Sequence, residues 1–296
     1  MNDNVLLYVV KAADKYIYLR DVLISQMQVS HSLLIKLKLQ HKIMVNGQVT
    51  YTNYRLQEGD LVTADISLDE QNHIIPEDIP LDIVYEDPDL LAINKPPGLA
   101  VHPSKGIFEG TLANAVTYYW IKQGKSLLFR PINRLDKDTS GLILIGKSQF
   151  AHQAIFRQQK LGTIRRTYLA VVKGIIDEDS GCINKPIAHI YPNSCARTID
   201  LSGKPAVTNY TVLKRFRDFT LLSLTLDTGR THQIRVHLSQ SGYPICGDTL
   251  YGQPSSLISR QALHAFQLTF QQPRTGTTLQ FEAALPLDIA KLLESL

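Results

Sequence analysis

Residues 133–141, Asn133-Arg134-Leu135-Asp136-Lys137-Asp138-Thr139-Ser140-Gly141, lead directly into the apolar run Leu142-Ile143-Leu144-Ile145, and this segment is the most informative about the fold. The run predicts an apolar strand, and the polar residues before it are typical of a turn. The same stretch puts the Asp136 carboxylate between the cations of Arg134 and Lys137. A buried carboxylate that needs cations beside it is costly to build. The stretch alone is compatible with a structural ion pair and with a functional site.

Further strands are predicted on both sides of this stretch. They cover residues 83–85, 90–93, 168–172, 210–213, 221–226 and 263–270, while residues 111–121 and 149–159 have helical patterns. Many short strands without regular alternation with helices indicate a mixed or antiparallel sheet and not a doubly wound one. The predicted fold class is therefore α+β, with a mixed, largely antiparallel central sheet and flanking helices over residues 81–296.

A separate small unit is predicted at the amino-terminal end, over residues 1–67. Apolar residues recur at helical spacing near residues 19–27 and again after the N-cap candidate Ser30. A short apolar run then meets Asn46-Gly47, a strong hairpin signal, and Glu58-Gly59-Asp60 is a second turn. Residues 68–80 are polar, acidic and punctuated by proline, which predicts a linker. We therefore expect a small α+β module, a linker, and a large domain over residues 81–296.

The bulk composition is that of a globular protein. The chain has 296 residues, of which 44% are hydrophobic and 20% charged, and no run approaches the roughly 18 apolar residues that span a bilayer. Its first four residues lack the basic segment and apolar block of a secretory signal, so we expect a cytoplasmic protein without membrane contact. No coiled-coil heptads are visible, and a monomer is the default expectation.

Cysteine and histidine give no sign of a metal site. Cys182, Cys195 and Cys246 are odd in number, and no two of them form a Cys-x-x-Cys pair. His232 and His237 are five residues apart, whereas ligands on one helical face are four apart. We therefore predict neither a disulfide framework nor a bound metal.

Positive charge is concentrated in the middle of the chain. The net charge is only +4, yet residues 122–173 contain eleven Lys or Arg against two acidic residues, Asp136 and Asp138. Such a concentration is typical of a surface that meets a polyanion such as RNA. An ordinary solvated basic face has the same composition.

Four patches in the large domain combine reactive side chains with turn residues. They are residues 94–103, residues 133–141, Arg165-Arg166-Thr167-Tyr168, and residues 228–237. Their order and spacing resemble those of the RluA-type pseudouridine synthases, over residues 81–286. Additional matches to that family are Gly203-Lys204-Pro205-Ala206, residues 242–248 with Tyr251, and Leu263-His264-Ala265.

The amino-terminal module is similar to the alpha-L RNA-binding motif. The similarity lies in the helix pair, the Val45-Asn46-Gly47 turn and the closing turns at Tyr54-Arg55-Leu56 and Glu58-Gly59-Asp60. Members of that motif usually carry several arginines on the second helix. This chain offers Lys36, Lys38 and Lys42 instead, so its grip on phosphates is expected to be weaker or reshaped.

The resemblance implies a pseudouridine synthase fold and the isomerisation of uridine to pseudouridine in RNA. That reaction breaks the bond between ribose and uracil nitrogen, rotates the uracil, and rejoins it through carbon 5. It requires a carboxylate and no cofactor, and Asp136 aligns with the family's essential aspartate. Attack on ribose carbon 1, attack on the uracil ring and abstraction of a sugar proton all remain open as chemical routes.

Three further residues receive roles from the resemblance. Burial would protonate Asp136 unless a cation lies beside it, and Arg235 matches the family's arginine that pairs with the carboxylate. Alternatively, Arg230 and Arg235 are exposed strand residues. Tyr168 matches the tyrosine that stacks on the flipped base, although a tyrosine at a strand position is also a common core residue. Arg134 matches the residue that fills the space left by the extruded base.

The other predicted RNA contacts surround these residues. Asn133 replaces the usual histidine and is interpreted as a supporting residue, while Arg166 replaces the usual lysine. His102 and His232 are interpreted as residues that stabilise turns or face RNA, with general acid–base catalysis as the alternative. The predicted RNA-binding residues are Asn133, Arg134, Lys137, Arg166, Arg230 and His232, together with Lys36, Lys38 and Lys42 of the module.

The sequence thus predicts an RNA pseudouridine synthase. Large-subunit ribosomal RNA is the favoured substrate, because the alpha-L module accompanies many such family members, and transfer RNA is the alternative. A catalytically idle RNA-binding or ribosome-assembly factor is a second alternative. A glycosidase with Asp136 and Asp138 as its carboxylate pair is disfavoured, because residues two apart point to opposite faces of a strand.

Overall fold

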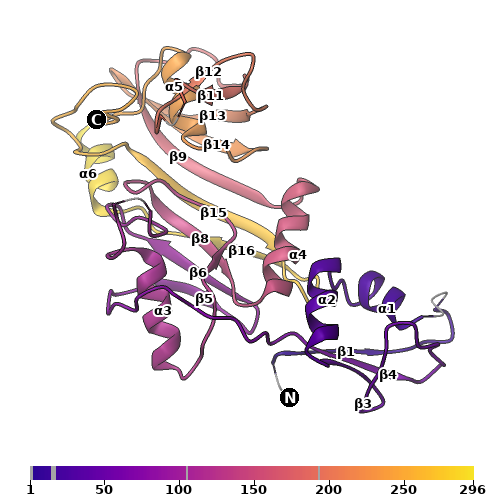
Figure 1. Ribbon diagram of the computed structural model, residues 1–296. Coiled ribbons are helices and arrows are strands. Elements are labelled where there is room, and N and C mark those ends of the chain that lie inside the picture. Colours follow the sequence, from indigo (N-terminus) through magenta and orange to yellow (C-terminus); the bar gives the residue numbers. More distant parts are fainter. Residues whose placement is uncertain (1–2, 15–17, 105, 193) are drawn as a thin grey trace.

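The computed structural model describes residues 3–14, 18–104, 106–192 and 194–296. Residues 1 and 2, which belong to the start used above to argue against a secretory signal, lie outside the described residues. A small amino-terminal unit stands beside a much larger body built around one sheet (Figure 1). No helix in the described ranges has the length and apolar character needed to cross a membrane.

The amino-terminal unit is a four-stranded sheet covered by two helices. The predicted helices are observed as α1 and α2, and the side chain of Ser30 caps α2 by accepting a hydrogen bond from the amide of Leu33. The predicted hairpin joins β2 to β3 through Asn46 and Gly47, both at positive φ. The edge strand β1 was not predicted. In chain order the elements are β1 (Val5–Val9), α1 (Leu19–Ser25), α2 (His31–Leu39), β2 (Ile43–Val45), β3 (Gln48–Val49) and β4 (Leu61–Asp65).

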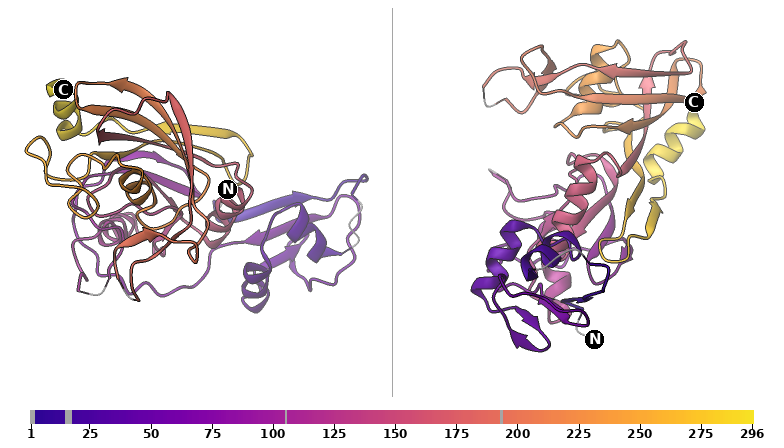
Figure 2. Two further views of the ribbon diagram at one scale, coloured as in Figure 1. Left: turned by 90° about the horizontal axis from the view of Figure 1, so that it is seen from above. Right: turned by 90° about the vertical axis from the view of Figure 1, so that its right-hand side faces the viewer.

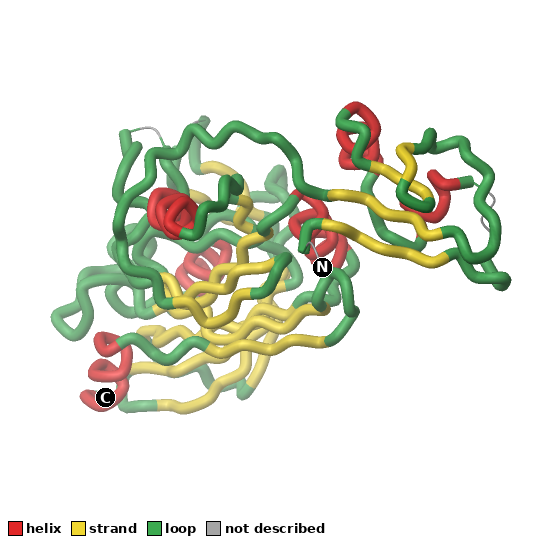
Figure 3. The backbone as a smooth tube through the Cα atoms, turned by 90° about the horizontal axis from the view of Figure 1, so that it is seen from below, coloured by secondary structure: helices red, strands yellow, loops and turns green. Residues whose placement is uncertain are grey.

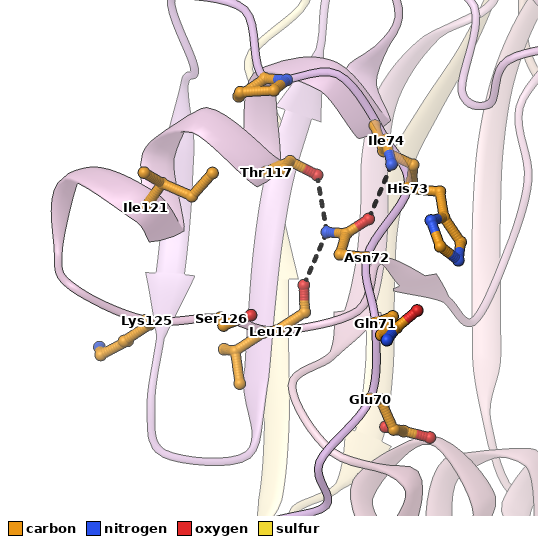
Figure 4. Close-up of a pocket in the computed structure, with 11 residues that line it drawn as sticks. Glu70, Gln71, Asn72, His73, Ile74, Thr117, Ile121, Lys125, Ser126 and Leu127 are labelled. Carbon is orange, nitrogen blue, oxygen red and sulfur yellow. Dashed lines mark hydrogen bonds between the residues drawn. The ribbon is translucent and has the colours of Figure 1, made fainter.

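The segment between the two parts has no helix or strand from residue 66 to residue 82, but it is held against the large body. The amide of Asn72 donates to the carbonyl of Leu127 at 3.0 Å and to the hydroxyl of Thr117 at 3.3 Å. Thr117 lies on helix α3 (Leu112–Lys122), and a cavity of about 510 Å³ separates the segment from this helix (Figure 4). The predicted linker is therefore an irregular segment that is held in place along α3.

The large body contains a ten-stranded sheet in the order β10-β13-β14-β9-β15-β8-β6-β5, with β16 paired to β15 and β7 paired to β8. Every described pair is antiparallel except β15 with β8, so the predicted fold class is confirmed. Figure 3 shows these strands side by side. The strands are β5 (Ile83–Glu86), β6 (Leu90–Lys95), β7 (Arg130–Pro131), β8 (Ser140–Gly146), β9 (Arg165–Lys173), β10 (Ser180–Asn184), β13 (Val207–Arg215), β14 (Phe219–Leu226), β15 (Leu263–Gln271) and β16 (Thr278–Glu282), and a separate pair is β11 (Ile187–His189) with β12 (Arg197–Ile199).

Strand β8, predicted from the apolar run, lies at the centre of the core and is buried at every residue. Its alternate side chains pack on opposite faces of the sheet. Ile143 and Ile145 pack with α3, whereas Leu142 and Leu144 pack with α4 (Gln149–Lys160). Gly141 has a φ of +110°, and a Cβ there would lie 2.2 Å from the carbonyl oxygen of Ala265, so only glycine fits where β8 meets β15.

Helix α4 also joins the two parts of the molecule (Figure 2). Phe150 inserts into the apolar core of the amino-terminal unit. The amides of Gln149 and Gln153 donate to the hydroxyl of Ser32 at 3.1 and 3.0 Å, and Arg157 donates to the carbonyl of Gln28 at 2.8 Å. These contacts set the orientation of the small unit relative to the sheet.

Two helices near the end of the chain were not predicted, namely α5 (Gln233–Gln240) and α6 (Leu287–Ser295). Helix α5 buries Gln233, Arg235 and His237 along with its apolar residues, so its apolar pattern is interrupted. The interpretation of Arg230 and Arg235 as exposed strand residues is wrong for Arg235, which lies on this helix and is only 7% exposed. Arg230 is exposed but lies in the turn before the helix and not on a strand.

Candidate active site

One cavity of about 570 Å³ gathers residues from distant parts of the chain. They include the loop after β6, which carries His102, the loop before β8, helix α4, the start of β9, and the turn that begins α5. Lys36, Lys38 and Lys42 of the small unit are not among its lining residues. Nine predicted site residues do line it: Asn133, Arg134, Asp136, Lys137, Arg166, Tyr168, Arg230, His232 and Arg235.

The loop that carries Asp136 is held by its backbone. The Asp136 carbonyl accepts the amide of Thr139 at 3.1 Å, which closes the predicted turn. Two buried cations bind the next two carbonyls, since Lys95 donates to Lys137 at 2.9 Å and Arg260 donates to Asp138 at 2.9 Å. The Asp136 side chain itself remains 25% exposed, so the carboxylate is open to the cavity and not sealed in a dry core.

Lys95, at the end of β6, received no role from the sequence. Its ammonium is fully buried and donates to three backbone carbonyls, those of Pro96, Leu99 and Lys137, at 2.7 to 2.9 Å. Burial lowers the pKa of Lys95 to about 7, while the nearby Asp138 carboxylate opposes this shift. Three acceptors match the three N–H groups of an ammonium, so only the charged form of Lys95 can donate to all three carbonyls at once. The sequence signal was a lysine that directly ends an apolar strand.

The cation that compensates Asp136 is Arg235 of α5. Its Nη1 donates to Asp136 Oδ2 at 2.9 Å. Its Nε and Nη2 bind both oxygens of Asp248 at 2.7 and 2.8 Å. Burial alone would raise the pKa of Asp248, but the hydrogen bonds and charge of Arg235 outweigh it and hold that pKa below its usual value. Asp248 thus orients the guanidinium toward Asp136, a role that sequence reasoning missed.

His232 faces the second oxygen of Asp136, with Nε2 at 3.8 Å from Oδ1. Its Nδ1 lies 2.8 Å from the hydroxyl of Tyr251, which already accepts the backbone amide of Arg197 at 2.8 Å. With one lone pair occupied by this amide, the hydroxyl is positioned to donate its proton to Nδ1, and we infer a neutral imidazole whose own proton is on Nε2. Burial lowers the pKa of His232, while the charge of Asp136 opposes this shift. A neutral N–H thus points at one carboxylate oxygen while Arg235 holds the other.

We expect Tyr251→Phe to release this tautomer. Without the hydroxyl, Nδ1 of His232 loses its donor, and the ring changes from nearly all Nε2–H to a mixture of tautomers. Nitrogen-15 NMR of histidine-labelled protein measures the two ring nitrogens, and His232→Gln identifies the signal by its loss. Tyr243→Phe is the matched control and leaves the tautomer unchanged. A pure Nε2–H signal in Tyr251→Phe would contradict the assignment.

Tyr168 and Arg166 lie on β9 and form one wall of the cavity. Tyr168 is 6% exposed, and burial raises the pKa of its hydroxyl, which stays protonated at neutral pH. Arg166 is 7% exposed, and its Nε has no hydrogen-bond partner within the described ranges. Gly229 leaves room for this guanidinium, because a Cβ there would lie 3.1 Å from Arg166 Nη1. A buried donor without a partner is suited to binding an incoming acceptor.

The residues that flank Asp136 in the sequence do not have the contacts first inferred for residues 133–141. Arg134 and Lys137 are exposed, and neither forms an ion pair with Asp136 in the part of the chain that the structure describes. Asn133 is buried, and its amide donates to the carbonyl of Leu142 at 3.0 Å and accepts the amide of Leu144 at 2.8 Å. Its side chain therefore continues the pairing of β7 along β8 and positions the loop, although it also lines the cavity.

The acidic pair considered for a glycosidase lies in this loop and not on a strand. Asp136 and Asp138 precede β8, so the argument from opposite strand faces does not apply to them. Asp138 has the larger and Asp136 the smaller effect of the two carboxylates on the charge of Lys95. Asp136 in addition pairs with Arg235.

The module's lysines are partly engaged within the protein. Lys36 pairs with Glu70 at 3.2 Å, and Lys42 pairs with Asp65 at 3.4 Å. Lys38 is exposed on the last turn of α2. Arg230, at the cavity, donates to the carbonyl of Pro205 at 3.0 Å.

Comparison with known proteins gives a consistent result. The chain matches a family model described as RNA pseudouridylate synthase over residues 89–240. It is 43% identical over 259 residues to the uncharacterized RNA pseudouridine synthase YlyB of Bacillus subtilis (strain 168), with 86% of each chain covered. It is 36% identical over 272 residues to ribosomal large subunit pseudouridine synthase D of Pasteurella multocida (strain Pm70), with 87% of this chain and 84% of that one covered.

A solved structure shares the fold as well. Human RNA Pseudouridylate Synthase Domain Containing 1 superposes with a TM-score of 0.56 at 27% identity, over 73% of this chain and 86% of that chain. The family match includes the loop of Asp136, the tyrosine on β9 and the arginine of α5. The cavity therefore lies within the shared region.

Proposed function

Because the chain belongs to the RNA pseudouridylate synthase family, we propose that its cavity is the active site, that Asp136 is the catalytic carboxylate, and that its substrate is large-subunit ribosomal RNA. The single observation that supports the site is the ion pair of Asp136 with Arg235 at 2.9 Å at an open cavity. The guanidinium offsets the charge of the carboxylate with a charge-assisted hydrogen bond, and exposure to the cavity lets the carboxylate reach a substrate.

The arrangement suits the isomerisation of a flipped uridine. The bond from ribose carbon 1 to nitrogen 1 breaks, a bond from carbon 1 to carbon 5 forms, carbon 5 loses a proton, and nitrogen 1 gains one. Asp136 acts on the ribose or the uracil while Arg235 holds one of its oxygens. The ring of Tyr168 stacks on the extruded base, and the free Nε of Arg166 binds an acceptor on the nucleotide.

Exposed cations extend the cavity into an RNA surface. Arg134 is placed beside Asp136 with its guanidinium free to enter the space that the flipped base vacates. Lys137 and Arg230 supply charge for phosphates at the rim. In the proposed reaction no cofactor participates, and the protein acts as a monomer in the cytoplasm.

The choice of RNA is supported by the relatives. Proteins named ribosomal large subunit pseudouridine synthase D, from Pasteurella multocida (strain Pm70) and Yersinia pestis, are 36 and 37% identical to this chain, and 87% of it is covered in each case. The small unit at the amino-terminal end adds a second basic surface, at α2, to that around the cavity.

Mapping of modified uridines tests this proposal. Ribosomal and transfer RNA from cells lacking the protein is treated with carbodiimide and read by reverse transcription. We expect discrete pseudouridines in large-subunit RNA to disappear, and to return with the wild-type gene but not with Asp136→Asn. Loss confined to transfer RNA would overturn the substrate, and unchanged maps in both RNAs would overturn the function.

The small unit is proposed to bind RNA through the last turn of α2. We expect the double variant Lys36→Gln/Lys38→Gln to bind a large-subunit RNA transcript roughly tenfold more weakly and to lower the slope of log Kd against log salt by about 1.5. Filter binding at several salt concentrations measures both quantities. The double variant Lys214→Gln/Arg217→Gln removes the same charge at the turn between β13 and β14 and serves as the control. An equal effect in the two variants would show a general charge effect and no α2 contact.

A further inference from the structure

The cavity continues beyond the residues that surround Asp136. Its far wall is one face of α4, which contributes His152, Phe156 and Gln159 to the lining. With Lys160 at the end of the helix, these residues lie at positions i, i+4, i+7 and i+8, so they share one side. We call this set, His152, Phe156, Gln159 and Lys160, the α4 face.

The other sides of α4 have structural partners. Ala151 and Ile155 pack into the core of the large body. Gln153 and Arg157 bind the amino-terminal unit. The α4 face borders the cavity, and of its residues His152 also contacts the large body, through the backbone of Pro131.

Phe156 is the unusual residue of this face. It is 46% exposed, and it belongs to none of the apolar core clusters that the described residues form. The ring of His152 lies nearly parallel to it, with 7° between the planes and 6.4 Å between the centroids. Burial lowers the pKa of His152, so its ring is neutral. The Lys160 ammonium lies 5.1 Å from the centroid of the Phe156 ring.

The charge of the cavity favours a nucleic-acid ligand at this face. Among the lining residues that the structure describes, Asp136 is the only carboxylate. The exposed cation of Arg134 lies in the same lining. Aromatic rings beside cations form the usual platform for unstacked bases of single-stranded RNA.

We propose that the α4 face is a second nucleotide subsite, which binds an unpaired base next to the reacting uridine by stacking on Phe156. The inference rests on the proposed active site, because extrusion of a uridine unstacks its neighbours and leaves their ring faces free. The side-chain amide of Gln159 hydrogen-bonds to the edge of that base. The Lys160 ammonium moves from the Phe156 ring to bind the adjacent phosphate. The subsite thus holds the RNA strand while the uridine enters the cavity at Asp136.

A binding cycle tests the subsite. Two single-stranded RNA decamers carry a central uridine, and the nucleotide after it is either 2-aminopurine or an abasic site. Both decamers carry the same fluorescein at the 5′ end, and the anisotropy of this label measures their affinities for full-length Asp136→Asn protein, which does not turn the RNA over. We expect the base to improve affinity about fivefold or more, as stacking typically does. Phe156→Ala removes that preference, and Phe156→Tyr keeps it.

Leu161→Ala is the matched control, because Leu161 is 74% exposed at the end of the same helix and lies outside the cavity lining. Quenching of the 2-aminopurine on binding reports stacking directly. Equal affinities for the two RNAs, a preference that survives Phe156→Ala, or its loss in Leu161→Ala would each overturn the subsite. Failure of the proposed function is seen separately, as unchanged pseudouridine maps in cells lacking the protein.

Discussion

Asp136→Asn is expected to abolish uridine isomerisation, by roughly 10⁴-fold or more in turnover. The amide has the shape of the carboxylate but neither its charge nor its nucleophilicity. Because the partner Arg235 remains paired with Asp248, no buried charge is stranded and the fold should persist. RNA affinity stays within a few-fold, since phosphate contacts dominate it.

Release of tritium from RNA labelled at carbon 5 of uridine measures this loss, because that proton leaves whenever the new bond forms. Asp179→Asn is the matched control, since Asp179 is 89% exposed and pairs with Arg215 at the surface. Turnover of Asp136→Asn within tenfold of the wild-type value would remove Asp136 from the catalytic role. Asp136→Ala is expected to behave in the same way.

Arg235→Met is expected to have the largest effect on stability. It leaves two carboxylates, Asp136 and the 1% exposed Asp248, without their shared cation. Removing one partner of a buried pair costs about 3 to 5 kcal/mol of unfolding free energy. Urea denaturation at pH 7 measures it. Arg217→Met, which removes a 94% exposed arginine that pairs with Asp218 at 4.0 Å, should leave the unfolding free energy nearly unchanged.

The pH dependence of this loss has a definite sign. In the wild type, Arg235 holds the pKa of Asp248 low, so that pair stabilises the fold above the pKa of an unfolded aspartate and less as pH falls. In Arg235→Met, burial still raises the pKa of Asp248, and only the backbone amides of Leu250 and Tyr251 oppose it. Protonation of Asp248 at lower pH therefore removes part of the destabilisation. The stability gap should therefore narrow from pH 7 toward pH 4.

A second substitution separates the stranded charge from lost packing. Arg235→Met/Asp248→Leu removes the buried carboxylate together with the cation, so it should recover part of the lost unfolding free energy. Arg235→Lys keeps the charge but cannot bind Asp248 at two points and Asp136 at a third. A stability of Arg235→Met equal to the wild type, or a double variant less stable than the single one, would contradict this account of the pair.

The helices and strands that have a local sequence pattern could be predicted without the structure. The apolar run after Asp136 specified β8, and Ser30 and Asn46-Gly47 specified a helix start and a hairpin. These features depend on the side-chain periodicity and backbone preferences of neighbouring residues, which a single sequence displays directly. Helix α5 was missed because its buried Gln233, Arg235 and His237 interrupt the apolar period.

The groups that surround the Asp136 carboxylate became known only from the folded chain. The cations next to Asp136 in sequence point to solvent, while Arg235 arrives from 99 residues away and is oriented by Asp248. Likewise the tautomer of His232 follows from a hydroxyl 19 residues further on, and the exposed ring of Phe156 faces the cavity only because α4 packs against β8. The physical reason is that ion pairs and hydrogen bonds depend on distance in space, whereas the order of residues fixes distance only along the chain.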